Sequence, residues 1–220
     1  MGEALYPTVG TVTAQNLIKA SEYNTVKTAI NILRDYVYVG WDDLRVPITS
    51  VKLQGTKDPD FAKVFDNGIA SQGVFIYLFD DGTEEEVYFT AQIPHEWKLE
   101  SNLIPHVHWL PQDAGGAGTN VCWGLEYVWI DIAGVATTTP IIYGDVTRLD
   151  ETLVADKHYI TELSEIDGTG QGMSSMLLCR LFRDTAGAGG TDDYVGDAGL
   201  MEFDFHIEID SFGSHEEYTK

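Results

Sequence analysis

The feature that most constrains the fold of this chain is a series of short strand-like segments, separated by turn signals, that follows Trp41. The clearest of them is 201–210, in which five apolar residues alternate with five charged or polar residues. Such alternation is typical of a β-strand with one face on a core and the other face outward. We therefore expect Phe203 and Phe205 to face a core, and Asp204 and His206 to face away from it.

The other segments predict a β-rich domain. Together with 201–210, the principal strands are expected at 44–53, 73–79, 85–93, 103–110, 120–132, 157–166 and 174–183, with a shorter candidate at 141–149. An Asp-Gly step at 81–82 is a strong hairpin signal, and the glycine-rich segment 113–118 predicts a second hairpin. Eight principal strands joined by such turns predict an all-β fold, an antiparallel β-sandwich of jelly-roll type.

The first forty residues have a different pattern, which predicts a short N-terminal helical segment. Ser21 can cap a helix that continues to about Tyr38. Its apolar residues are spaced by 3, 4, 3 and 4 positions: Tyr23, Val26, Ile30, Leu33 and Val37. This spacing is typical of a heptad seam, which favours contact between subunits. The alternative is that the helix packs on its own β-domain, with Ala29 and Ile32 also in contact.

These patterns divide the chain into two parts. Residues 1–40 are expected to form an arm and helix for anchoring and oligomerisation, and residues 41–220 are expected to form the β-sandwich domain. Two heptads are too few to hold a coiled coil together alone. We therefore expect the helix to join subunits, as a homotrimer, with help from the larger domain.

The net charge limits the partners of the chain. It has 13 Lys and Arg against 35 Asp and Glu, a formal net charge of -22 at pH 7. Binding to nucleic acid or to an anionic membrane normally relies on a basic surface, so neither partner is expected. Residues 1–10 have no basic start or apolar stretch, and no apolar run reaches about 18 residues. We therefore expect no signal peptide, no membrane span, and assembly in a cytosol.

Two histidines in the segment 103–109 form the main candidate for a metal site. His106 and His108 leave the same face of a strand, and His206 is a candidate third ligand. The His-x-His pair resembles the start of the metal motif of cupins, but no glutamate follows it and the glycine expected before it is Glu100. Alternatively, the His-x-His pairs of three subunits could surround one ion on the threefold axis of a trimer. The partners expected for a cupin site are absent from the sequence, so no cofactor is expected.

Aromatic and acidic clusters give the remaining candidates. Trp97 and Trp109 could stack on a sugar ring if they were exposed, although such residues more often fill a sandwich core. The acidic segment 80–86 is expected to be a solvated turn, and the Gly/Ala/Asp segment 184–199 a mobile loop. The sequence has no G-x-S-x-G elbow, Walker A loop or H-E-x-x-H motif, which favours a protein without catalysis.

Several segments of the sequence resemble a family of tailed-bacteriophage virion structural proteins, of the capsid decoration, head-fibre, neck or tail appendage type. They are Trp-Asp-Asp-Leu-Arg at 41–45, Ile-Pro-His-Glu-Trp at 93–97, Pro-His-Val-His-Trp at 105–109, Leu-Glu-Tyr at 125–127, Phe-His at 205–206 and Gly-Ser-His-Glu-Glu-Tyr-Thr-Lys at 213–220. The histidines of this family have no assigned chemistry, so no site residue is carried over from it.

The resemblance implies a non-enzymatic structural protein located in the virion. It implies an oligomeric subunit that docks on the capsid, neck or tail through its N-terminal segment, with copies of itself and other virion proteins as partners. Two alternatives stay open at this point. One is a receptor- or carbohydrate-binding appendage module that contacts a host-surface glycan, and the other is a cupin-like metal-binding enzyme.

Overall fold

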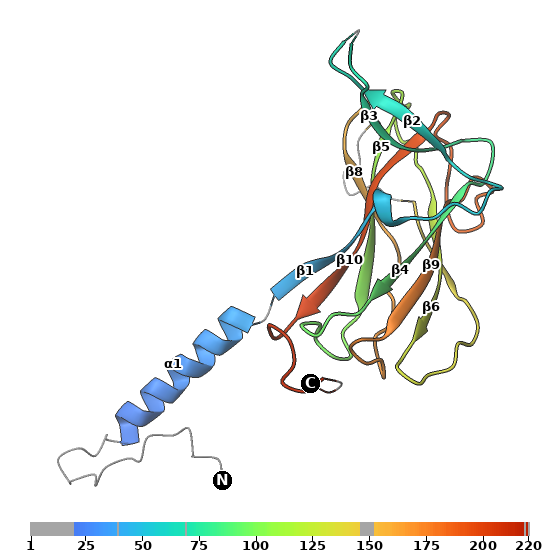
Figure 1. Cartoon of the computed structure of the whole chain (residues 1–220). Coiled ribbons are helices and arrows are strands. Elements are labelled where there is room, and N and C mark those ends of the chain that lie inside the picture. Colours follow the sequence, from blue (N-terminus) through green and yellow to red (C-terminus); the bar gives the residue numbers. More distant parts are fainter. Residues whose placement is uncertain (1–19, 39, 69, 146–151, 218, 220) are drawn as a thin grey trace. The chain divides into compact units, whose positions relative to one another are not determined.

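The computed structural model describes residues 20–38, 40–68, 70–145, 152–217 and 219, and Figure 1 shows their arrangement as one helix and a β-domain. Helix α1 covers Ala20–Tyr38. The strands are β1 (Gly40–Pro47), β2 (Asp60–Phe65), β3 (Val74–Phe79), β4 (Glu86–Gln92), β5 (Leu103–Pro111), β6 (Trp123–Ile130), β7 (Ile141–Gly144), β8 (Tyr159–Glu162), β9 (Met176–Arg183) and β10 (Ala198–Ile209). The all-β fold class predicted from the sequence is confirmed.

The strands form two antiparallel sheets around a large hydrophobic core, which makes a β-sandwich, and a second, small apolar cluster includes Ile76, Leu78 and Leu110. The six-stranded sheet has the order β2-β3-β10-β5-β8, with β1 also paired to β10. The four-stranded sheet has the order β4-β9-β6-β7. Strands β3 to β10 are therefore nested in pairs: β3 with β10, β4 with β9, β5 with β8 and β6 with β7. This nesting of eight strands in two sheets is the jelly-roll arrangement that the sequence predicts.

Both hairpin predictions were wrong. β3 and β4 flank the Asp-Gly step, and β5 and β6 flank the glycine-rich segment 113–118, but the two members of each pair lie in different sheets. The turn after β3 does form locally, because the Asp80 carboxylate accepts a hydrogen bond of 2.6 Å from the Gly82 N–H. A turn motif in the sequence indicates only that the chain changes direction. Whether the flanking strands pair with each other or cross to the opposite sheet depends on which of their faces must be buried.

The core lies between the two sheets and is rich in aromatic side chains. Trp109 and Trp123 come from opposite sheets, with ring centroids 6.4 Å apart, and Phe79 packs edge-on against Trp123 at 5.1 Å. Phe203 and Phe205 of β10 are also buried, as their alternation with charged residues predicts. Burial of each such side chain contributes roughly 1.5–3 kcal/mol, so this aromatic layer is a main source of stability.

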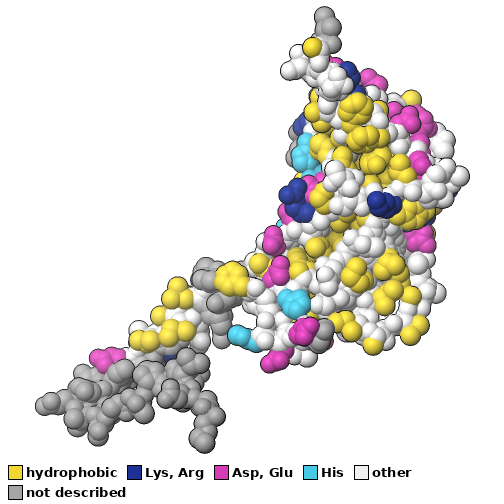
Figure 2. All heavy atoms as spheres, in the orientation of Figure 1, with side chains coloured by type: hydrophobic (Ala, Val, Ile, Leu, Met, Phe, Trp, Pro, Cys, Tyr) yellow, Lys and Arg dark blue, Asp and Glu magenta, His cyan; other side chains and the backbone are white. Residues whose placement is uncertain are grey.

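One strand of the six-stranded sheet was missed from the sequence. Strand β2 pairs with β3 at the edge of the sheet, and none of its residues is buried. Phe61 and Phe65 are 57% and 40% exposed, whereas Ala62 and Val64 on the other face are partly buried against a small apolar cluster of β3 and β5. Since apolar residues lie on both faces, no period-two pattern marks this strand. Apolar side chains are visible on the upper surface of the β-domain in Figure 2.

The segment 184–199, predicted to be a mobile loop with solvated carboxylates, includes the first residues of β10, and its part 184–197 contacts the buried side chain of Arg183. The guanidinium makes two hydrogen bonds to Asp192, of 2.8 and 3.0 Å, and the two side chains are 0% and 3% exposed. Its other donors reach three backbone carbonyls, those of Phe79, Tyr194 and Gly196. All five guanidinium N–H donors are thus used. The prediction of a solvated carboxylate was therefore wrong for Asp192, because its side chain is paired with a buried cation.

Helix α1 ends at Tyr38 as predicted but begins at Ala20, so Ser21 lies within its first turn and is not its cap, and the chain divides into two units at residue 40. All described side chains of the helix, at positions 21–33, are exposed. Four heptad residues are among them: Tyr23, Val26, Ile30 and Leu33. Figure 2 shows apolar side chains along this helix. The fifth heptad residue, Val37, lies in α1, but its side chain is outside the described part of the structure.

Candidate functional site

The outer face of the six-stranded sheet carries a cluster of histidines and carboxylates. Pairing registers place Arg45 of β1, Asp204 of β10, His106 of β5 and Glu162 of β8 in one row across four neighbouring strands. His108 lies two residues along β5 from His106, so its side chain leaves the sheet on the same face. The alternation of β10 and the His-x-His spacing of β5 therefore direct three titratable side chains to one place.

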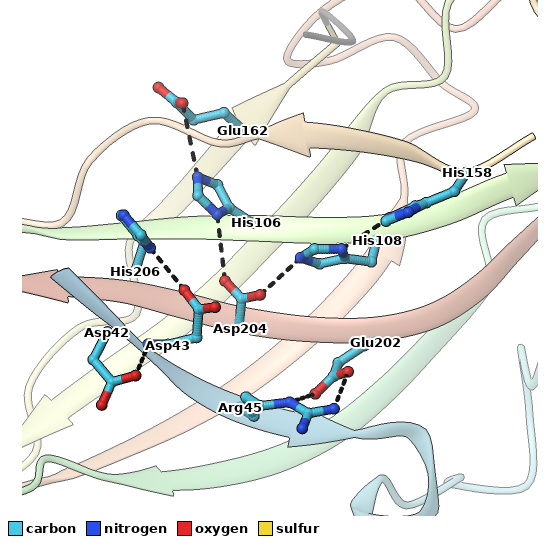
Figure 3. Close-up of polar contacts among 10 residues, drawn as sticks. All are labelled: Asp42, Asp43, Arg45, His106, His108, His158, Glu162, Glu202, Asp204 and His206. Atoms are coloured by element: carbon cyan, nitrogen blue, oxygen red, sulfur yellow. Dashed lines mark hydrogen bonds and ion pairs between the residues drawn. The ribbon is translucent and has the colours of Figure 1, made fainter.

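Three of these side chains converge, as Figure 3 shows. Nε2 of His108 lies 2.7 Å from Oδ2 of Asp204, and Nδ1 of His106 lies 3.4 Å from Oδ1 of the same carboxylate. One ligand atom from each of the three residues lies within 4.8 Å of the others. The Asp204 side chain is 5% exposed, against 12% for His106 and 22% for His108. The carboxylate thus forms the floor of the cluster, and the imidazoles are its more accessible part.

Each imidazole has a second partner on the side away from Asp204. Nε2 of His106 is 3.7 Å from a carboxylate oxygen of Glu162, and Nδ1 of His108 is 2.9 Å from Nε2 of His158. His158 immediately precedes β8, and its side chain is exposed. The contact with His158 limits rotation of the His108 ring, so its Nε2 is held facing Asp204.

The three central groups are electrostatically coupled. A hydrogen bond to Asp204 raises the pKa of His108 against the opposing effect of burial. Burial alone would raise the pKa of Asp204, but the contacts with His106 and His108 outweigh it and lower that pKa to about 2. Burial, followed by the nearby His108, lowers the pKa of His158. These directions favour the charged form of His108 beside ionised Asp204 and neutral His158. In that form Nε2–H of His108 faces Asp204 and Nδ1–H faces Nε2 of His158.

His206, the third histidine predicted as a metal ligand, lies nearby but outside the group of converging ligand atoms. Its Nδ1 lies 2.7 Å from a carboxylate oxygen of Asp43, and its ring stacks on Trp41 with centroids 4.9 Å apart. The His206 ring is 5.4 Å from that of His106. Since Nδ1 of His206 is already engaged by Asp43, the histidine belongs to a neighbouring pair on the same face.

Sequence reasoning missed Asp204 and His158 as members of the cluster. The outward position of Asp204 was visible in the alternation of 201–210, which is the only signal that the sequence offers for it. Its position opposite His106 depends on the register between β10 and β5, and these strands are about a hundred residues apart in the chain. His158 has no periodic pattern around it, so its contact with His108 could not be inferred.

Trp97 and Trp109 lie in the core, and neither offers a ring face to a ligand. Both are 0% exposed. The Trp109 indole donates a hydrogen bond of 2.9 Å to the Thr161 hydroxyl, and the Trp97 ring packs against Trp129 at a centroid distance of 5.6 Å. Stacking on a sugar needs an exposed aromatic face, so the ligand-binding alternative for these two residues is corrected to core packing.

A second group of carboxylates lies in a hollow on the outer face of the four-stranded sheet. Arg180 binds Glu86 at 2.6 Å and Glu126 at 2.9 Å. The pKa of Glu86 is lowered because hydrogen bonds from three neighbours outweigh its burial. The pKa of Glu126 is lowered first by a hydrogen bond from Thr139 and then, against burial, by Arg180. A glycosidase needs one carboxyl with a raised pKa as its acid, so this pair does not fit that chemistry.

We expect the stability contributed by Asp204 to depend on pH. Folding lowers the pKa of Asp204 from 3.8 to about 2, so its contribution is present above pH 3.8 and is lost as the pH falls towards 2. Folding raises the pKa of His108 from 6.5, so that contribution is present below pH 6.5 and is lost as the pH rises through the folded value. Metal-free Asp204→Asn should therefore be less stable than the wild type by about 2 kcal/mol at about pH 5, and by less on either side.

Denaturant unfolding of both proteins between about pH 2 and 8 measures this difference. The matched control is Asp43→Asn, which removes the carboxylate that contacts His206 on the same sheet face. The Asp43 side chain is 51% exposed, so the expected cost is below about 1 kcal/mol. A difference between wild type and Asp204→Asn that stays constant with pH would contradict the coupling of Asp204 to His108.

No protein-family model matches the chain, and a search of curated proteins found no similar sequence. Within the described residues, no helix is both long and apolar enough to span a bilayer. The function is therefore inferred from the geometry above and from the sequence resemblance.

Proposed function

We propose that this chain is a non-enzymatic structural subunit of a tailed-phage particle, which forms homotrimers and docks on the capsid, neck or tail through its N-terminal segment. The observation that carries this proposal is the exposed heptad seam of α1. Tyr23, Val26, Ile30 and Leu33 are 54–62% exposed. An apolar seam on a 19-residue helix gains stability when it is buried against other copies of the same helix.

The fold and the charge of the chain agree with this role. Jelly-roll sandwiches are a common architecture of viral capsid proteins, where eight strands form a rigid block with few free edges. A net charge of -22 makes separate copies repel one another in solution. A specific contact is then needed to bring subunits together, and the apolar helix supplies one that does not depend on charge.

Ile30→Glu/Leu33→Glu is expected to convert the protein from a trimer to a monomer. The two glutamates place charges in the centre of the seam, where burial of an unpaired charge is costly. Sedimentation velocity or light scattering of the full chain measures the change in mass. The melting of the β-domain should stay the same, because the substitutions lie in the other unit of the chain.

The matched control is Thr28→Glu/Asn31→Glu, which adds the same two charges to the opposite side of α1. Both control positions are exposed, and the control protein should remain trimeric. A wild-type chain that is strictly monomeric at all concentrations, or a control that dissociates as fully as the seam variant, would contradict the proposal. The copy number and position of the subunit in an intact particle then identify the attachment point.

A further inference from the structure

We propose that His106, His108 and Asp204 bind one divalent transition-metal ion, of the class of Zn²⁺, on the outer face of the six-stranded sheet. This inference does not depend on the virion role, because it concerns only side chains of β5 and β10. Two imidazoles and one carboxylate form a donor set that binds Zn²⁺ and related first-row ions, with at least one position left for water or another ligand.

The distances between the donor atoms fit an ion after a small adjustment of side chains. Around an ion with bonds of about 2.0–2.1 Å, tetrahedral ligand atoms lie roughly 3.4 Å from each other. The contact between Nδ1 of His106 and Asp204 is 3.4 Å, and the contact between Nε2 of His108 and Asp204 is 2.7 Å. These contacts use the two different oxygens of Asp204, and one ligand atom from each of the three residues lies within 4.8 Å of the others. The contact between His108 and Asp204 must lengthen on binding, so that the ion replaces their hydrogen bond.

The carboxylate at the floor of the cluster has an unused oxygen. Asp204 is 4% exposed, and its Oδ1 is a buried oxygen that makes no hydrogen bond within the described part of the structure. A buried polar atom without a hydrogen bond is costly, and native structures usually satisfy it with a protein group, water or an ion. Oδ1 faces Nδ1 of His106, which is where an ion held by the three residues would lie (Figure 3).

The outer partner of His108 matches that of a metal-bound histidine, and a carboxylate lies near the outer nitrogen of His106. A histidine that binds a metal through one nitrogen normally donates its other ring N–H to an acceptor, which fixes the ring and its tautomer. Glu162 lies 3.7 Å from the outer nitrogen of His106, and the imidazole of His158 lies 2.9 Å from the outer nitrogen of His108.

Zinc binding by the untagged full chain tests the proposal. After removal of metal with EDTA and dialysis, competition with a chromophoric chelator should show one Zn²⁺ per chain. Asp204→Asn and His106→Ala/His108→Ala should each weaken binding by more than about 100-fold, because each removes a direct ligand. His158→Ala should weaken it by only about 10–100-fold, the range found for outer partners of metal ligands.

His206→Ala and His95→Ala are the matched controls, and both should bind Zn²⁺ as the wild type does. His206 is a neighbour on the same face that pairs with Asp43, and His95 is bonded to two serines elsewhere. Thermal unfolding in EDTA establishes which variants are folded. If a ligand variant is unfolded, X-ray absorption of the zinc-loaded wild type decides, since the proposal requires scattering from two imidazoles and no sulfur.

Three outcomes would overturn the proposed site. The first is a wild-type chain that retains less than one Zn²⁺, and the second is an absorption spectrum without imidazole ligands. The third is that His158→Ala loses Zn²⁺ binding whereas Asp204→Asn keeps it, which would place the ion between His108 and His158. Agreement of the stoichiometry, the variant series and the spectrum would establish the site.

Discussion

Arg183→Met is expected to lower the free energy of unfolding by about 3–5 kcal/mol, the range for removing one partner of a buried ion pair. Methionine donates no hydrogen bond, so Asp192 is left 3% exposed without its cation. Three backbone carbonyls lose their donors as well, those of Phe79, Tyr194 and Gly196. Urea unfolding of the wild type and the variant measures the difference.

Arg45→Met is the control for this prediction. Arg45 also makes two hydrogen bonds to one carboxylate, that of Glu202, at 2.5 and 2.6 Å. Its side chain is 66% exposed, so water replaces the lost contacts and the expected cost is below about 1 kcal/mol. If both variants lose the same stability, Arg183 does not organise the segment 184–197. A substitution of Arg183 that loosens only this loop should also increase its proteolysis and hydrogen exchange.

Trp109→Ala is expected to cost about 3–5 kcal/mol, which is the range for truncating a large buried aromatic side chain. The Trp109 ring packs against Tyr159 at a centroid distance of 5.6 Å and contacts Trp123 across the sandwich. Truncation also leaves the buried Thr161 hydroxyl without the indole N–H that lies 2.9 Å away. Guanidinium unfolding followed by far-ultraviolet circular dichroism measures the loss.

Trp41→Ala is the control for this prediction, because it truncates a tryptophan that lies outside the core. Trp41 is 53% exposed and stacks on His206, so its removal should cost less than about 1 kcal/mol. Trp109→Phe should fall between the two, because a smaller ring keeps part of the packing and loses the hydrogen bond. A Trp109→Ala protein with wild-type stability would mean that Trp109 does not hold the two sheets together.

The sequence was sufficient for the fold class and insufficient for the connections. The alternation of 201–210 identified β10 and its buried face, and the heptad spacing identified α1 almost to the residue. Both are local patterns that reflect burial on one face. The hairpins failed because β3 and β4 belong to opposite sheets, and β2 was missed because this edge strand has apolar residues on both faces and therefore no alternation. The burial of Arg183 was not predicted, because no periodic pattern in the sequence marks a buried cation.

About half of the candidate site could be predicted from the sequence. His106 and His108 were found from their spacing alone, since two residues apart on a strand means one shared face. Asp204 was seen as outward-facing, but its place beside His106 follows from a pairing between strands far apart in sequence. His206 was considered as the third ligand because it is a histidine on a later strand, as in the cupin motif, whereas the register brings Asp204, two residues before it, opposite His106. Residue type therefore indicated a possible metal site, and the register between β5 and β10 determined that Asp204, and not His206, lies opposite His106.

The position of β10 determines when the β-domain can fold during synthesis. This strand pairs with β1, β3 and β5, yet it is made after all three. Ribosomes add about 5–20 residues per second, so the edges of β3 and β5 stay unpaired for several seconds while the chain between β5 and β10 is translated. Unpaired strand edges are prone to join other chains. Nascent chains of this protein therefore need protection from one another on a polysome, and a chain interrupted before residue 198 cannot close its sandwich.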